Sequence, residues 1–205
     1  MRTIKAITAL VALLLVANVA KVEAQAGDWW FGFTYGASVP SGDTKEFASG
    51  TSWRNFGIDG RKMVKDNISL GFYVAWNVFD EIRTEVETVE LEGAAISGTP
   101  FTYVNAFPLL ATAHYYIGNP DWRGGIRGFI GGGAGAYVSE YRADIGLNSF
   151  TSTAWHLGLS GDAGVGYRFR SPWAMYLSAR YNYGFKAKDR TLQYWAFNLG
   201  VAWSN

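Results

Sequence analysis

The sequence predicts an all-β fold, an eight-stranded antiparallel up-and-down transmembrane β-barrel, from three observations. Apolar side chains recur at every second position through most of the chain after residue 28, which is the period of a β-strand. The residues between them are mostly small or polar rather than Lys or Glu. The connections between these segments all suit hairpins, so no crossover helix is required.

The composition excludes several classes of protein. The chain of 205 residues contains 13 Phe, 12 Tyr and 9 Trp, and only 17% of its residues are charged, which is not the composition of a disordered protein. A formal net charge of +1 gives no reason to expect a nucleic-acid partner. The absence of cysteine excludes a disulfide scaffold, a thiolate metal site and a cysteine nucleophile.

Residues 1–26 are expected to be a signal peptide rather than part of the fold. Arg2 and Lys5 give a basic start, Ala6 to Ala20 are largely apolar, and Ala24-Gln25-Ala26 offers cleavage after Ala24 or Ala26. The alternative is an uncleaved membrane anchor, but the apolar segment is shorter than the about 20 residues that a spanning helix needs. Residues 27–205 then form one barrel domain.

Eight segments of the remaining chain are predicted to be strands. In five of them every position on one face is apolar, and the positions between are mostly small or polar. These five are 29–39, 68–78, 107–117, 175–185 and 195–203. Three are less regular: 53–64, the Gly-rich segment 126–138, and 155–168. In the first of these three, Phe56 and Ile58 share a face opposite Asn55, Gly57 and Asp59.

Longer and shorter connections alternate along the chain, as in an antiparallel meander. The long connections are 40–51, 79–98 and 142–153, the connection 186–191 is of medium length, and the short ones are 65–67, 118–124 and 170–173. Asp66-Asn67, Asn119-Pro120 and Ser171-Pro172 have the residues that tight turns favour.

The composition of the two faces decides which of them meets lipid. A soluble barrel would carry many charged residues on its polar face, at about 25–35% of surface positions. Here that face has few charges and many small residues, which suits the narrow interior of an eight-stranded barrel. Aromatic residues gather near strand ends, as in the girdles of membrane barrels. They are Trp29, Tyr115, Tyr167 and Trp203 at one rim, and Trp76, Trp155, Tyr183 and Trp195 at the other.

With these features the chain resembles the small eight-stranded outer-membrane β-barrels of Gram-negative bacteria, of the OmpA/OmpX type. The resemblance is carried by the signal peptide, Gly57-Ile58-Asp59-Gly60 followed by Ser69-Leu70-Gly71-Phe72, the Gly-rich stretch 128–137, Gly164-Val165-Gly166-Tyr167-Arg168-Phe169, and a last strand that ends near an aromatic residue. The terminal aromatic usual in the family is displaced, because Ser204 and Asn205 follow Trp203.

The resemblance implies an outer-membrane location, with both termini and the short turns in the periplasm and the long loops outside. It implies contact with outer-membrane lipid and lipopolysaccharide, and insertion by the barrel assembly machinery. We expect the protein to be a porin-like monomer. We expect it to bind no cofactor or metal and not to be an enzyme. Its role would be structural or a surface interaction, with extracellular loops displayed from a plugged barrel. The alternatives are an OmpW-like passive transporter of small hydrophobic molecules, a lipid A-modifying enzyme, and a soluble carrier.

Ionisable residues at inward-facing positions form the main candidate site. They are Arg127, Asp162, Arg168, Arg180, His114 and His156. Asp59 and Arg61 are also at positions that the alternation places on the inward face. An ion or solute pathway would use such residues. Charges in a dry interior must be paired, however, and eight strands leave no open channel. We therefore predict a structural polar network in the barrel interior.

Two patterns that suggest chemistry have simpler interpretations. Gly131 to Ala136 match the letters of a dinucleotide-binding motif, but the stretch lies inside a strand with no helix after it. We expect these glycines to permit close packing and curvature in a narrow barrel. His114 and His156 are the only histidines and no His-x-Ser pair is present, so the sequence gives no Ser–His geometry.

The connection 79–98 is rich in acidic residues. They are Asp80, Glu81, Glu85, Glu87, Glu90 and Glu92. Their spacing matches no calcium-binding loop, and a run of like charges is usually solvated. The residues between them suit an extension of the hairpin above the membrane, where an exposed edge could bind another strand.

Overall fold

The computed structural model describes residues 29–82, 87–91, 94–118, 124–146, 148–170 and 172–204. The predicted signal peptide lies outside the described residues. No helix in the described ranges is long and apolar enough to cross a membrane.

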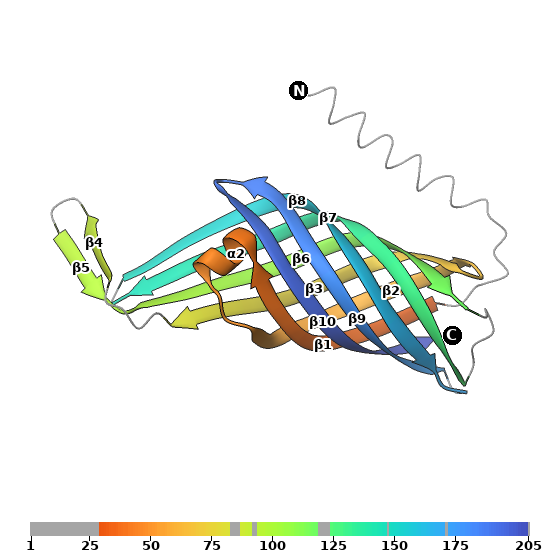
Figure 1. Ribbon diagram of the computed structural model, residues 1–205. Coiled ribbons are helices and arrows are strands. Elements are labelled where there is room, and N and C mark those ends of the chain that lie inside the picture. Colours follow the sequence, from red (N-terminus) through yellow and green to blue (C-terminus); the bar gives the residue numbers. More distant parts are fainter. Residues whose placement is uncertain are drawn as a thin grey trace, which may run out of the picture.

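Eight antiparallel strands close into a barrel, which confirms the predicted fold (Figure 1). They are β1 (Trp29–Ser41), β2 (Ser52–Lys65), β3 (Ile68–Ile82), β6 (Pro100–Ile117), β7 (Gly125–Ile145), β8 (Asn148–Arg168), β9 (Trp173–Ala187) and β10 (Arg190–Ser204). Each strand pairs with the strand next to it in this order, and β1 pairs with β10 to close the barrel. The closing pair extends from Trp30 opposite Ser204 to Ser41 opposite Gln193. Closure satisfies the backbone within the sheet, as hydrocarbon requires.

The two ends of the barrel differ. The turn end carries the short connections 66–67, 118–124 and 169–172. The loop end carries α2 (Gly42–Phe47) and the separate hairpin of β4 (Glu87–Leu91) and β5 (Ala94–Gly98). In Figure 1, α2 lies across the barrel at the loop end, and the β4–β5 hairpin lies beyond it.

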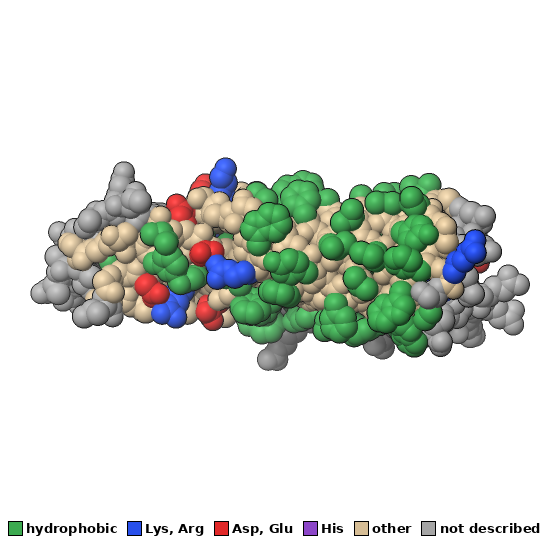
Figure 2. Space-filling view, turned by 90° about the horizontal axis from the view of Figure 1, so that it is seen from below, with side chains coloured by type: hydrophobic (Ala, Val, Ile, Leu, Met, Phe, Trp, Pro, Cys, Tyr) green, Lys and Arg blue, Asp and Glu red, His purple; other side chains and the backbone are tan. Residues whose placement is uncertain are grey.

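The apolar face points outward and the polar face inward, as the sequence predicts for a membrane barrel. Phe72 and Leu199 are 42% and 44% exposed, whereas Asp162 and Arg180 are 7% and 1% exposed. On the face that Figure 2 shows, hydrophobic side chains gather in a broad band across the barrel, and charged side chains lie beyond it at both ends. Phe56 is exposed and Asn55 and Asp59 are buried, so the predicted parity of the least regular strand is confirmed.

Glycines allow neighbouring strands and large inward side chains to come close. A Cβ atom on Gly135 would lie 2.1 Å from the carbonyl oxygen of Leu109 on the paired strand. The stretch Gly131 to Ala136 lies within β7. This placement agrees with a packing role for these glycines and lacks the helix that a dinucleotide site would need.

The prediction of a medium connection at 186–191 is wrong, because only two residues separate Ala187 at the end of β9 from Arg190 at the start of β10. The prediction of a long connection at 142–153 is also wrong. Strands β7 and β8 continue past the apolar band, and Ile145 pairs with Asn148 at their tip. Above the band, water replaces hydrocarbon as the solvent of the outer face. The alternation between apolar and polar residues therefore fades although the strands persist.

Candidate functional site

The inward side chains form layers along the barrel axis. The layer nearest the turn end is aromatic and apolar; it contains Trp30, Met63, Tyr116, Phe129 and Tyr176. Near the loop end a second apolar cluster includes Phe79, Val104, Tyr141 and Leu192, with Phe47 of α2 packed against it. His114, Asp162 and Arg180 lie in the middle parts of their strands, whereas Arg127 and Arg168 lie nearer the turn end.

A compact charged cluster unites three of the six predicted network residues. The Oδ2 atom of Asp162 on β8 accepts from His114 Nε2 at 3.1 Å and from Arg180 Nη2 at 3.2 Å. The guanidinium of Arg180 also lies 3.7 Å from the ring centre of Tyr73. The three side chains come from β6, β8 and β9, so the cluster depends on the register across the sheet.

A second buried ion pair joins Arg61 and Asp59, both on β2. Arg61 Nη2 donates to Asp59 Oδ2 at 2.6 Å, and Arg61 Nη1 donates to Tyr116 at 3.0 Å. Tyr176 donates to the same Asp59 oxygen at 3.3 Å. In these two contacts each buried carboxylate, Asp59 or Asp162, accepts from a buried guanidinium, Arg61 or Arg180, which is the condition for burying charge.

The structure leaves the other three predicted residues outside this cluster. Arg127 near the turn end donates to the carbonyl oxygen of Asp66 at 2.8 Å and lies over the ring of Tyr116. Arg168 is buried at the last position of β8. His156 lies nearer the loop end, in contacts of its own.

His156 joins three strands at the point where β8 separates from β9. Its Nδ1 lies 2.8 Å from the carbonyl oxygen of Phe185, and its Nε2 lies 2.8 Å from Ser139 Oγ. A carbonyl oxygen only accepts, so Nδ1 carries a proton and donates to it. Ser139 and His156 are fully buried. The contact therefore ties strands together rather than presenting a nucleophile.

The side chains that contact these charged residues and histidines could not be identified from the sequence. Tyr73, Tyr176 and Ser139 occupy inward positions, but nothing local distinguishes them from other inward residues. Their contacts bridge strands whose register is set by closure of the whole barrel.

The first connection at the loop end is held against β10 by two side chains of α2. Asp43 Oδ2 accepts from the backbone N–H of Thr191 at 2.7 Å and from its hydroxyl at 2.9 Å. Thr44 Oγ1 accepts from the backbone N–H of Gln193 at 2.9 Å. The hydrogen bonds from Thr191, aided by Lys186 and Arg190, lower the pKa of Asp43 from its usual 3.8.

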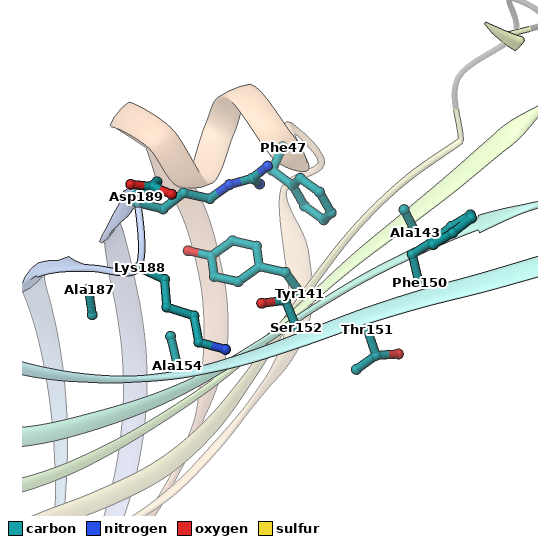
Figure 3. A pocket seen from close by; sticks show the side chains of 11 residues that line it. Phe47, Tyr141, Ala143, Phe150, Thr151, Ser152, Ala154, Ala187, Lys188 and Asp189 are labelled. Atoms are coloured by element: carbon teal, nitrogen blue, oxygen red, sulfur yellow. The ribbon is translucent and has the colours of Figure 1, made fainter. Parts of the chain in front are cut away.

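A cleft of about 280 Å³ opens beside this connection, between the upper part of β8 and the β9–β10 turn (Figure 3). Its lining residues are Phe47, Tyr141, Ala143, Phe150, Thr151, Ser152, Ala154, Ala187, Lys188, Asp189 and Arg190. Tyr141 and Ala154 follow Ser139 and His156 at the next inward positions, so the His156 contact lies below the cleft.

The cleft combines aromatic surface with positive charge. Arg190 lies over the rings of Phe47 and Tyr141, 4.6 Å and 5.3 Å from their centres. Lys188 has φ of 52°, the left-handed region that non-glycine residues rarely occupy. Among the described residues, neither cation forms an ion pair. The arrangement suits an acidic ligand with apolar parts.

The remaining candidates are accounted for in the described part of the chain. Asp80 pairs with Arg54, and Glu81 accepts from the backbone N–H of Ser49 at 2.7 Å. Glu85 and Glu92 lie outside the described residues, and so do the side chains of Glu87 and Glu90. No group of three or more His, Asp or Glu residues in the described ranges could hold a metal ion.

Comparison with known proteins agrees with this architecture. A family model described as the outer membrane protein beta-barrel domain matches residues 7–204. No curated protein matches the sequence.

Three solved structures share the fold at low sequence identity. The N-terminal β-barrel domain of Pseudomonas aeruginosa OprF is 13% identical, with a TM-score of 0.50, and the match covers 88% of this chain and 100% of that one. Neisserial surface protein A is 16% identical, with a TM-score of 0.51 and coverage of 87% and 97%. Ail, the attachment invasion locus protein of Yersinia pestis, is 14% identical, with a TM-score of 0.54 and coverage of 88% and 100%.

Proposed function

We propose that this chain, which belongs to the family of outer membrane protein β-barrel domains, presents an interaction surface to the outside of the cell. In this proposal it is an outer-membrane protein and not an enzyme. The loop end would be extracellular, and the turn end and both termini periplasmic. The barrel assembly machinery would insert the protein as a monomer, with outer-membrane lipid and lipopolysaccharide around its apolar band.

The observation that carries the proposal is the extension of β7 and β8 beyond the apolar band, next to a cleft that is lined by Lys188 and Arg190. A protein whose task ended at the membrane would have no need of paired strands in water. Ail, one of the similar structures, has been solved with the heparin analogue sucrose octasulfate, which supports a surface role for barrels of this fold.

A closed lumen is part of the proposal. The paired charges around Asp162 lie between two apolar layers, an arrangement that favours a plug over a continuous apolar tunnel. Transport of small hydrophobic molecules would require such a tunnel. Planar bilayers that contain the folded protein should therefore show no steady conductance, and a stable open channel would contradict the plug.

Display at the cell surface can be tested with single cysteines, because the chain contains none of its own. Lys188→Cys lies at the loop end, and its matched control Lys62→Cys lies near the turn end. A bulky polyethylene glycol maleimide should modify residue 188 in intact cells and residue 62 only after the outer membrane is permeabilised. The reverse pattern would overturn the proposed orientation.

A further inference from the structure

The upper part of β8 is a sheet edge with no strand beside it. Pairing between β8 and β9 ends at Gly158 opposite Gly184. Residues 148–157 continue to pair with β7 on their other side. Figure 1 shows the β7–β8 pair reaching past the β9–β10 turn. The sheet therefore offers an open edge of ten residues at the loop end.

The pairing at the strand tip indicates which backbone groups face this edge. Ile145 and Asn148 flank a two-residue connection and pair with each other. Such a hairpin closes on a hydrogen-bonded pair, and this bonding alternates along an antiparallel ladder. Residues 149, 151, 153, 155 and 157 thus direct their N–H and C=O groups away from β7, toward an incoming strand.

The opposite edge of the protruding sheet is protected, whereas the β8 edge is not. At the β3 edge, Arg54 pairs with Asp80 and Ser49 binds Glu81, so charged residues and a covering segment block it. Residues 148–157 contain no charged residue and no proline, and 148–153 are exposed. Unprotected β-prone edges of this kind pair readily with added strands.

The cleft lies directly along this edge. Phe150, Thr151, Ser152 and Ala154 contribute the β8 side of the cleft. On the other side of the cleft, Lys188 and Asp189 belong to the β9–β10 turn (Figure 3), and Arg190 at the start of β10 also lines the cleft. The charged residues that line the cleft are thus two cations and one acid, and Asp43 of α2 also interacts electrostatically with Arg190. An added strand would therefore place alternate side chains in a positively charged, partly aromatic cleft.

We propose that residues 149–155 of β8 capture an extended, acidic polypeptide segment by strand addition, with its acidic side chains facing Lys188 and Arg190. This inference rests on the proposed surface role and names the chemistry of the partner. A second copy of the chain is a poorer occupant, because pairing two such edges would bring two sets of cations together.

The test uses the folded full-length barrel in lipid nanodiscs and a fluorescein-labelled nonapeptide that alternates threonine with glutamate. Fluorescence anisotropy should show binding of this peptide. A peptide with proline at its centre, or with lysine in place of glutamate, should bind about tenfold more weakly, the effect of losing one hydrogen bond or charge contact.

Variants of the protein locate the binding. Thr153→Pro removes an edge N–H without breaking the β7 ladder and should weaken binding about tenfold, whereas the control Thr153→Val should not. Lys188→Glu should reverse the preference toward the lysine peptide. Heat-modifiable migration on a gel checks that each variant is folded, and the proline peptide probes the edge even where Thr153→Pro does not fold.

Three outcomes would overturn the inference: no binding of the acidic peptide, equal binding of the proline peptide, or a dimer that forms through this edge without peptide. If residue 188 is accessible in intact cells but the peptide does not bind, the surface role stands and only the strand-addition site fails. If residue 188 is inaccessible, the surface role itself fails.

Discussion

At the residue scale, Asp162 accepts hydrogen bonds from two buried side chains on different strands, His114 and Arg180. A cation left in the barrel interior without its carboxylate is expensive, because neither water nor another anion replaces the lost partner. The position of Asp162 in the interior therefore bears on the stability of the whole sheet.

We predict that Asp162→Asn lowers the free energy of unfolding by about 3–5 kcal/mol, since it leaves Arg180 buried without its charge partner. The matched control is Asp144→Asn, which breaks the exposed pair with Arg142 and should leave stability almost unchanged. Urea titration in lipid vesicles, followed by tryptophan fluorescence, measures both. Equal losses for the two variants would contradict a structural role for the buried cluster.

Sequence reasoning located these residues better than it located their partners. The period of two places Asp162, Arg180 and His114 on the inward face from local pattern alone. The pattern does not show which of these side chains contact one another, because cross-strand neighbours depend on the register of the strands in the closed barrel. His156 was grouped with them on parity, yet it lies at a different level, where β8 leaves β9.

At the element scale, α2 depends on a carboxylate that is outside the membrane-spanning strands. The pKa of Asp43 is lowered in the folded protein by the hydrogen bonds from Thr191. The stability that this contact contributes is therefore present above the usual pKa of 3.8, and it is lost as the pH falls through the lower folded value.

We predict that the amide hydrogen of Thr191 exchanges slowly at pH 5–7, once intrinsic rates are taken into account, and loses protection below about pH 4. Asp43→Asn should remove this pH dependence, since the amide does not titrate. Hydrogen exchange by nuclear magnetic resonance on the protein in micelles follows the Thr191 signal. Protection that does not change between pH 6 and pH 3 would exclude Asp43 as its source.

Strand β7 needs glycine where β6 approaches closely. Gly135→Ala would place a Cβ atom 2.1 Å from the Leu109 carbonyl oxygen, so we predict a loss of about 1–3 kcal/mol in folding stability. Gly161→Ala is the matched control, because no atom lies within 4 Å of its added Cβ. The same urea titration compares the two, and a Gly135→Ala barrel as stable as the control would contradict the packing role.

Strand limits were predicted well inside the membrane and poorly outside it. Segments such as 68–78 and 195–203 lie within β3 and β10, because lipid on one side and a polar interior on the other enforce strict alternation. The residues 142–153 lack that contrast, since no lipid covers the outer face of the protruding strands and most of their side chains are exposed or half-buried. The six-residue helix α2 likewise has too little apolar pattern to be predicted.

At the scale of the whole molecule, the barrel has an apolar outer band and an interior in which a charged cluster around Asp162 lies among two clusters of aromatic and apolar side chains. Eight strands and their faces followed from the sequence. The predicted barrel implies that β1 pairs with β10, but the register of that pair and the open edge of β8 did not follow from the sequence, because both depend on how the strands meet in three dimensions.

The most direct test of this account measures what the outward residues touch. Single cysteines at Phe72 and Leu199, and at the inward Ser178 and Asn198, would carry spin labels in the otherwise cysteine-free chain. In lipid bilayers, labels at 72 and 199 should collide often with dissolved oxygen and rarely with a water-soluble nickel complex, and labels at 178 and 198 should be shielded from both. Frequent nickel collisions at 72 and 199, with oxygen collisions at 178 and 198, would contradict the assignment of the apolar face to lipid.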